Sequence, residues 1–171
     1  SVVADRASSG SVYVGTTAFS GPLAAATIES FAKEAADAGA SRRVDVPSAP
    51  VETVLDGDVL WFVTRGGEVY RLPSGAASPE LAATSPGSFI DGSLTLDATH
   101  VYFVANRSTT DATRVVLRVT KAGGPLETFP VSLPREQVIE SVAVTPDSVY
   151  VAASRYGSDA ELSGFLYKIA K

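Results

Sequence analysis

The hydrophobic residues of this chain lie in short runs that are separated by polar, glycine and proline positions. One kind of run recurs four times, as GSVYVGT (10–16), GDVLWFV (57–63), THVYFVA (99–105) and DSVYVAA (147–153). Each copy starts with a polar or turn-forming pair and continues with valine and then an aromatic residue or leucine. The valines, Val12, Val59, Val101 and Val149, follow one another at intervals of 47, 42 and 48 residues. A β-rich run that returns at such intervals predicts a repeated structural unit.

A second kind of run follows the first in each unit. It reads IESFAK (28–33), VYRLPS (69–74), VLRVTK (116–121) and LYKIAK (166–171). Each copy has an apolar residue, a polar or basic residue two places later, and then a second apolar residue. β-Branched and aromatic residues are frequent in these runs, which indicates β-strands. Two kinds of run in the same order, four times, predict four copies of one unit.

Further short apolar segments extend each unit. SVVAD, VETVLD, SLTLD and SVAVTPD precede the first kind of run, and RRVDVP, ELAATSP and ETFPVSLP follow the second kind in the first three units. We place the units at residues 1–47, 48–87, 88–135 and 136–171. The fourth unit therefore has three predicted strands where the others have four.

Two other interpretations of the pattern remain open. The segment IESFAKEAADAGA (28–40) also fits a helix, because Ile28, Phe31 and Ala35 have near-helical spacing and Gly39 could end it. We prefer a strand over 27–33, since the corresponding runs of the other units are strand-like, and keep one helical turn over 34–38 as an option. A β-sandwich is the second alternative, because regularly spaced short strands would suit that fold too.

A four-strand repeat of this period is the sequence signature of a β-propeller blade. A small twisted sheet cannot bury both of its faces alone, whereas stacking such sheets around an axis buries both. Stacking explains why VLWFV and VYFVA are almost continuously apolar instead of alternating. We therefore predict an all-β chain with a single propeller region of about four four-stranded antiparallel blades. We expect it to be part of a larger ring or to be closed by a partner.

The repeats resemble those of secreted bacterial propellers in the broad YWTD-like and NHL-like group. In that group an Asp-x-x-x-Val/Leu-Tyr-Trp/Phe strand precedes a Gly-x-Val/Ile-x-Arg/Lys-Val/Leu strand. The matching positions are Asp97, Val101, Tyr102, Phe103, Asp147 and Tyr150 for the first motif, and Gly67, Val69, Arg71, Leu72, Gly164, Leu166, Lys168 and Ile169 for the second. The chain departs from the pattern because Trp61 is its single tryptophan and the Tyr-Trp pair is absent. The resemblance implies an exported bacterial protein that is extracellular, periplasmic or attached to the cell surface.

The charge balance argues against nucleic acid as a partner. The chain has 171 residues, with 14 Lys and Arg against 19 Asp and Glu, and a formal net charge of -5. Phosphate binding needs a basic patch, and Arg42-Arg43 is the only adjacent basic pair in the sequence. The absence of cysteine excludes disulfides and thiolate sites. No apolar run approaches the roughly 20 residues that span a bilayer.

The chemistry available for catalysis is limited. His100 is the single histidine, and a histidine can serve as a general base or metal ligand. Its counterparts in the other units, Ser11, Asp58 and Ser148, cannot replace it chemically, so we interpret His100 as a turn residue. There is no Gly-x-Ser-x-Gly segment for a serine nucleophile and no EF-hand spacing of acidic residues. We therefore expect no catalytic residue, metal or cofactor in this chain.

The connections between the second and third strands of the units vary most. They are TTAFSGPLAAA (16–26), NRSTTDAT (106–113) and SRYGSDAELSG (154–164), and the second unit has only a short turn near TRGG. In a propeller these connections lie on one face, and loops on a rigid scaffold are where binding residues concentrate. The candidates for binding a protein or glycan are Phe19, Arg65, Arg107, Asp111, Arg155 and Tyr156.

The segment SGFLYKIAK raises a separate expectation about assembly. No fourth strand is predicted beside it, and exposed strand edges are usually covered. We expect a strand from upstream of Ser1 or from another chain to pair with Phe165, Leu166, Tyr167, Lys168, Ile169 and Ala170.

The leading functional hypothesis is a binding module without catalytic activity. One alternative is an assembly unit that completes a propeller with another chain or with further N-terminal blades. The other is a propeller lyase or glycosidase whose catalytic residues lie outside this chain.

Overall fold

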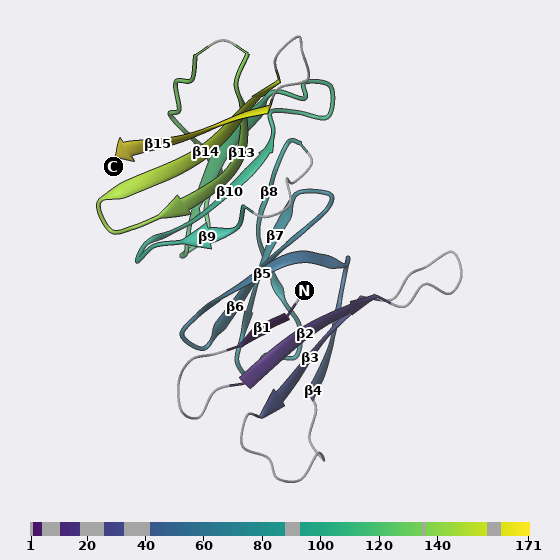
Figure 1. The fold of residues 1–171 in the computed structure, drawn as a ribbon. Helices are drawn as coiled ribbons and strands as arrows, with labels where there is room; N and C mark the ends of the chain where they lie inside the picture. Colours follow the sequence, from purple (N-terminus) through teal and green to yellow (C-terminus); the bar gives the residue numbers. More distant parts are fainter. Residues whose placement is uncertain are drawn as a thin grey trace.

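The computed structural model describes residues 2–4, 11–17, 26–32, 42–87, 93–134, 136–156 and 162–171. The regular secondary structure of these residues consists of strands (Figure 1). The strands are β1 (Val2–Ala4), β2 (Ser11–Thr17), β3 (Ala26–Ala32), β4 (Arg42–Val46), β5 (Pro50–Asp56), β6 (Val59–Thr64), β7 (Glu68–Pro73), β8 (Glu80–Thr84), β9 (Thr95–Leu96), β10 (His100–Asn106), β11 (Arg114–Thr120), β12 (Glu127–Phe129), β13 (Val138–Val144), β14 (Ser148–Tyr156) and β15 (Leu162–Ala170).

The strands form four separate sheets, and every pairing within them is antiparallel. Sheet 1 has the order β1-β2-β3-β4, sheet 2 has β5-β6-β7-β8, sheet 3 has β9-β10-β11-β12, and sheet 4 has β13-β14-β15. Figure 1 shows the sheets following one another in chain order, with sheet 1 at the bottom and sheet 4 at the top. This arrangement confirms the predicted all-β architecture of three four-stranded units and one three-stranded unit.

The strand predicted over 27–33 is present as β3, which spans Ala26–Ala32. The alternative helix over this segment is therefore wrong, and residues 34–38 lie outside the described residues. Two outer segments are shorter than predicted. SLTLD contributes only β9, and ETFPVSLP contributes only β12. Proline has no N–H for a sheet ladder, and Pro130 follows the end of β12 directly.

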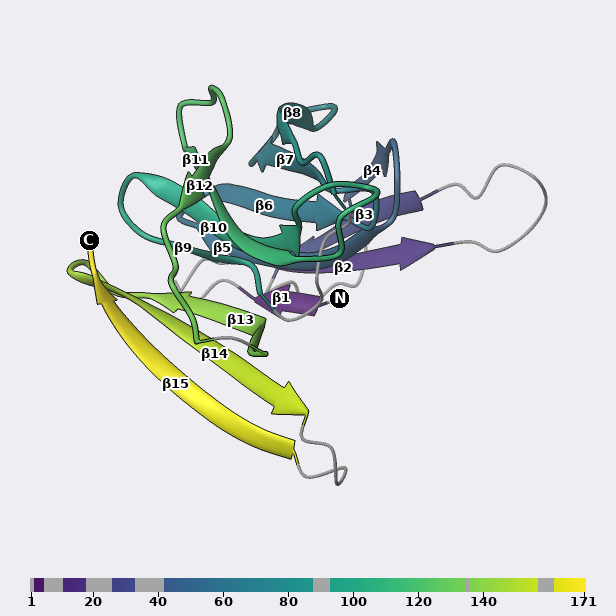
Figure 2. The same ribbon diagram turned by 90° about the horizontal axis from the view of Figure 1, so that it is seen from above.

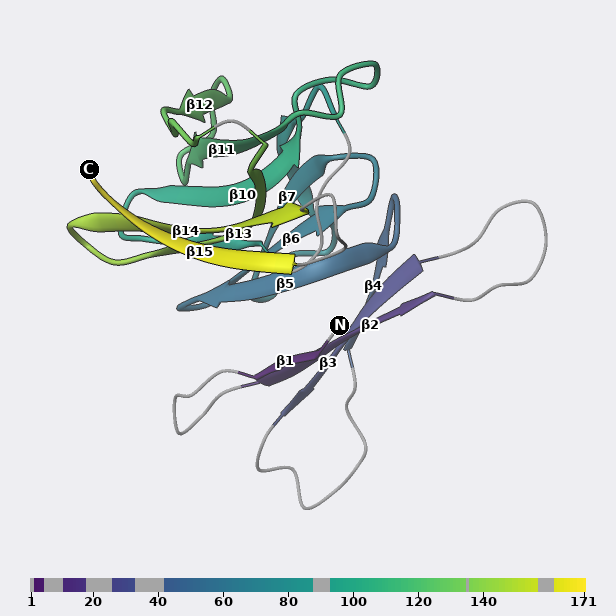
Figure 3. The ribbon, with the colours of Figure 1, turned by 45° about the horizontal axis from the view of Figure 1, so that its top comes forward.

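The first strands of consecutive sheets are neighbours in space. β1 contacts β5, β5 contacts β9, and β9 contacts β13. Each sheet thus begins next to the start of the previous one and runs outward by hairpins. The long, curved hairpin of β14 and β15 is visible in Figures 2 and 3.

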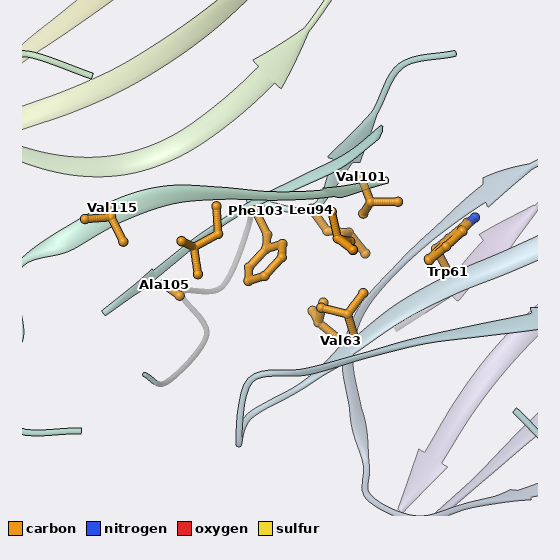
Figure 4. Close-up of a cluster of buried hydrophobic side chains, with 10 residues drawn as sticks. Trp61, Val63, Leu94, Val101, Phe103, Ala105 and Val115 are labelled. Carbon is orange, nitrogen blue, oxygen red and sulfur yellow. The ribbon is translucent and has the colours of Figure 1, made fainter. Parts of the chain in front are cut away.

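Three hydrophobic cores lie between the four sheets, one at each interface of two consecutive sheets. Between sheets 1 and 2 the core contains Ile28, Val44, Leu60, Phe62, Tyr70 and Leu72. Between sheets 2 and 3 it contains Trp61, Val63, Val69, Leu94, Val101, Phe103 and Leu117, and Figure 4 shows side chains of the two sheets meeting. Between sheets 3 and 4 it contains Tyr102, Val104, Val116, Phe129, Ile139, Val149 and Val151.

Alternate residues of one strand enter different cores. Leu60 and Phe62 of β6 face sheet 1, while Trp61 and Val63 of the same strand face sheet 3. Side chains of a strand point alternately to its two faces, so a strand with neighbours on both faces needs apolar residues at every position. This is the physical reason for the continuous apolar runs in β6 and β10.

Candidate binding face

The predicted binding face is the end of the sheets where second strands turn into third strands. In the antiparallel sheets this end carries the β6–β7 turn, the β10–β11 loop, the end of β14 and the start of β15. It also carries the end of β8, with residues 85–87, and the described part of the link from β12 to β13. We call this end the loop face.

The β10–β11 loop is held by its own hydrogen bonds. The Arg107 N–H donates to the carbonyl oxygen of Thr113 at 2.8 Å, and the Asp111 N–H donates to Ser108 Oγ at 3.0 Å. Asp111 Oδ1 accepts from the Thr113 N–H at 2.9 Å. Hydrogen bonds from Thr113, assisted by the charge of Arg107, hold the pKa of the Asp111 carboxyl below its usual range. These hydrogen bonds fix the conformation of the loop, and the side chain of Arg107 on it is exposed to solvent.

A pocket of about 480 Å³ lies between this loop and the link from β12 to β13. Its polar lining residues include Arg107, Arg114, Thr128, Glu136 and Gln137. Its apolar lining residues include Phe129, Pro130, Val131, Leu133 and Pro134. The volume is within the usual range of small-molecule and side-chain sites, and the mixed lining suits a ligand with both apolar and charged groups.

A polar network beneath the pocket joins sheets 3 and 4. Arg114 Nη1 donates to the carbonyl oxygen of Ile139 at 3.0 Å and to the Glu140 carboxylate. The Ser154 hydroxyl donates to the other oxygen of Glu140. The hydrogen bond from Ser154, together with Arg114 and against the opposing effect of burial, lowers the pKa of Glu140. The carboxylate is therefore ionised at neutral pH and keeps Arg114 in place at the pocket.

The link that forms the other wall is anchored as well. The Tyr167 hydroxyl donates to Gln137 Oε1 at 2.6 Å, which ties the link to β15. Glu136 has φ of 71°, the only positive φ of a non-glycine among the described residues. A positive φ is uncommon for a residue other than glycine. Glu136 is one of the residues that line the pocket.

The structure places the predicted binding residues at different points of the loop face. Arg107 lines the pocket, and its Nη1 lies 3.7 Å from Asp111 Oδ2. Arg65 is exposed in the β6–β7 turn, and Arg155 is exposed near the end of β14. Among the described residues neither arginine lines the pocket.

Two predicted residues are less fully described. Phe19 lies outside the described residues. The backbone of Tyr156 ends β14 opposite Leu162, and its side chain is not described.

Sequence reasoning missed most of the pocket. Arg114, Leu133, Glu136 and Gln137 come from a strand start and from an irregular link. The available signal was the pair Pro130 and Pro134, which interrupts an apolar segment and keeps it out of a sheet.

The opposite end of the sheets carries a second polar cluster, around Asp97. Its carboxylate accepts hydrogen bonds from the Thr99 and His100 N–H groups, both at 2.8 Å, from the Tyr102 hydroxyl at 3.0 Å and from the Lys171 ammonium. Burial raises the pKa of Asp97, but these hydrogen bonds together outweigh burial and lower it far below its usual range.

The His100 ring bonds to a different group. Its Nδ1 lies 2.7 Å from Thr99 Oγ1. Within the part of the chain that the structure describes, no three His, Cys, Asp or Glu side chains are grouped to hold a metal ion.

Comparison with known proteins gives matches to solved structures only. No protein-family model and no curated protein matches the sequence. The N-terminal domain of Nup159, a propeller, superposes with a TM-score of 0.57 over 91% of this chain and 44% of that chain, at 14% identity. Synechocystis apocarotenoid oxygenase superposes with a TM-score of 0.52 over 94% and 45%, at 12% identity. BamB from Moraxella catarrhalis gives a TM-score of 0.49 over 84% and 48%, at 16% identity.

The chain folds as part of a β-propeller. It spans less than half the length of these solved chains, and at such low identities the likeness describes the fold alone. None of the described residues belongs to a helix that is long and apolar enough to cross a membrane.

Proposed function

We propose that this chain is a propeller module without catalytic activity, which binds a protein or glycan segment through the loop face. The pocket between the β10–β11 loop and the link from β12 to β13 carries the proposal. Its apolar wall suits an aliphatic or aromatic side chain, and the exposed Arg107 suits a carboxylate beside it. A protein segment supplies both groups in one extended ligand, so it is the preferred class.

The resemblance of the repeats to secreted bacterial propellers supports the proposal in one further respect. We propose that the module works outside the cytoplasm, in the periplasm, on the cell surface or in the medium. Ligand binding by a rigid loop face needs no cofactor, and the acidic net charge of -5 disfavours nucleic acid as the ligand.

The experiment is selection of ligands with the full chain, from a displayed random-peptide library and from a glycan array. Selected ligands are then titrated by fluorescence anisotropy against the wild type, Leu133→Asp and Arg107→Glu. We expect Leu133→Asp to weaken binding about tenfold or more, as for a truncated contact at the centre of an interface. Arg107→Glu should weaken binding of acidic ligands by about fivefold, as for an exposed ion pair.

Arg43→Glu is the matched control, because Arg43 is exposed on β4, far along the chain from the pocket, and does not line it. Circular dichroism of each variant checks that it is folded. Ligands that bind all variants equally, or a selection that yields no ligand, would contradict the loop-face proposal.

An assembly role is the second candidate function. The observation that favours it is that β15 pairs with β14 alone among the described residues.

A further inference from the structure

The outer edge of β11 is only partly covered by β12. In the register of sheet 3, Glu127 lies opposite Arg118 and Phe129 lies opposite Val116, and the pairing ends there. β11 begins two residues before Val116, at Arg114. Figure 2 shows the chain leaving β12 and running toward β13. Arg114 therefore lies on a stretch of edge that β12 does not reach.

The main-chain groups of Arg114 point to this open edge. In an antiparallel strand the N–H and C=O groups of successive residues are directed alternately to the two sides. The Arg107 N–H donates to the carbonyl oxygen of Thr113, and the Lys121 N–H donates to that of Thr99, both at 2.8 Å. Thr113 thus bonds toward the side of β10, so the groups of Arg114 are directed away from β10. Among the described residues they have no main-chain partner.

The corresponding position is covered in sheets 1 and 2. Ala26, Gly67 and Arg114 each lie two residues before the first apolar residue of the second repeated run. In sheet 1, Ala26 pairs with Val46 of β4. In sheet 2, the carbonyl oxygen of Gly67 accepts from the Ser85 N–H at 2.9 Å. The position is open in sheet 3, which has sheet 2 on one face and sheet 4 on the other.

The loop-face pocket lies at this gap. Arg114 and Val115 of β11 line one side of it, and Pro130, Val131 and Leu133 of the link line the other. A continued β12 would bring Val131 opposite Arg114. Instead the side chains of Val131 and Leu133 pack against the core between sheets 3 and 4. The pocket therefore lies where the fourth strand of sheet 3 would otherwise continue.

We infer that this pocket binds an extended polypeptide whose main chain pairs with the outer edge of β11 at Arg114. The bound strand runs antiparallel to β11, as the fourth strands do to the third strands. One of its residues exchanges two hydrogen bonds with the N–H and C=O of Arg114, which is strand addition to a sheet edge. The inference rests on the proposed function, because it assigns the ligand class and the binding mode of the same pocket. A glycan has no alternating N–H and C=O groups for this pairing.

The side chains around the gap indicate which sequences fit. In the antiparallel direction, the ligand residue opposite Ala112 comes two positions after the residue opposite Arg114. Arg107 belongs to the same loop as Ala112 and also lines the pocket. Its ion pair with Asp111, at 3.7 Å, is exposed and therefore weak, whereas the Arg114 side chain is bonded to Glu140. The preferred ligand therefore has an apolar residue, any residue and then an acidic residue.

The test uses synthetic peptides of this order. The probes are Gly-Ala-X-Thr-Asp-Ala-Gly, with X as leucine, phenylalanine or valine and with acetylated and amidated ends. They are titrated into the full chain, and NMR follows the Leu133 methyl signals and the exchange of the Arg114 amide hydrogen. In the free chain this hydrogen should exchange about tenfold or more faster than that of Val116, which β12 covers. Saturating peptide should slow it by about fivefold or more.

N-methylated peptides separate main-chain pairing from side-chain binding. Methylation of the X nitrogen removes the N–H that donates to the carbonyl oxygen of Arg114. It should weaken binding by about fivefold, the contribution of one hydrogen bond. Methylation of the threonine nitrogen is the matched control, because that N–H points away from β11, and it should leave the affinity nearly unchanged. Leu133→Asp should weaken all three peptides, while Arg43→Glu should not.

The outcomes distinguish this inference from the proposed function. Peptides that shift the Leu133 signals but leave the Arg114 exchange unchanged would overturn the inference and leave the proposed function standing. Equal losses from the two methylations would have the same meaning, as would a glycan that binds where no peptide does. An Arg114 amide that is already as protected as that of Val116 in the free chain would also overturn it. If neither a peptide nor a glycan binds the loop face, both proposals are wrong.

Discussion

At the scale of single residues, polar side chains at the sheet ends join neighbouring sheets. Lys171 follows β15 of sheet 4 and donates to Asp97 of sheet 3 and, at 2.7 Å, to the carbonyl oxygen of Thr145. Lys121 follows β11 of sheet 3 and bonds to Asp56 of sheet 2 at 2.7 Å. The lysine after a third strand thus binds the aspartate at the end of the previous sheet's first strand. These paired charges position consecutive sheets at the end opposite the loop face.

The Asp97 pair predicts how stability depends on pH. The pKa of Asp97 is lowered in the folded chain, so its contribution to stability is complete above the unfolded value of about 3.9 and is lost as the pH falls below it. We expect the free energy of unfolding, measured by urea denaturation, to decrease from about pH 5 downward. Asp97→Asn should lower the free energy of unfolding at pH 7 and make its decrease at acid pH (the acid slope) shallower. Part of this decrease should remain, because the pKa of Glu140 is also lowered in the folded chain.

Asp58→Asn is the matched control, because Asp58 is exposed in a corresponding turn. It should leave both the stability at pH 7 and the acid slope close to those of the wild type. An Asp97→Asn variant with the slope of the wild type would show that the Asp97 carboxylate is not the group responsible.

At the scale of elements, the β6–β7 turn is fitted to the link that follows β8. Gly67 has φ of 91°, and its carbonyl oxygen accepts from the Ser85 N–H at 2.9 Å. A Cβ atom on Gly67 would lie 2.5 Å from the carbonyl oxygen of Gly87, which is closer than such atoms approach. The turn therefore needs glycine for its conformation and also for the space around it.

Gly67→Ala tests the second requirement when it is compared with Gly123→Ala. Gly123 has a similar φ of 86°, but no atom lies within 4 Å of its added Cβ. Both variants bear the cost of a left-handed alanine, roughly 1 kcal/mol. Gly67→Ala should lose about 1–3 kcal/mol more, because backbone must shift to relieve the contact. Equal free energies of unfolding for the two variants would mean that the link moves away freely.

The elements were predictable from the sequence to the extent that they follow the repeat. β3 could be assigned as a strand because its counterparts in the other units are rich in valine, leucine and tyrosine, although its own alanines and glutamate also suit a helix. The pocket was not predictable in the same way. Leu133 and Glu136 reach it through an irregular link whose course depends on contacts with sheet 4, and no local pattern encodes those contacts. Arg107 was found because its loop is long, which is a local property.

At the scale of the whole molecule, the three cores lie in series. Each core is built from two adjacent sheets, so sheets 1 and 4 share no core among the described residues. Stability in such an array is approximately a sum of the stabilities of units and of nearest-neighbour interfaces. A substitution in one core should therefore act mainly on the two sheets that form it.

Phe62→Ala and Val151→Ala test this expectation at opposite ends of the series. Phe62 belongs to the core of sheets 1 and 2, where its ring stacks on Tyr70 with centroids 5.1 Å apart, and Val151 belongs to the core of sheets 3 and 4. Phe62→Ala should cost about 3–5 kcal/mol at its interface and speed hydrogen exchange in sheets 1 and 2 far more than in sheet 4. Val151→Ala should show the reverse distribution. If either variant accelerated exchange equally in all four sheets, the sheets would unfold as one cooperative body.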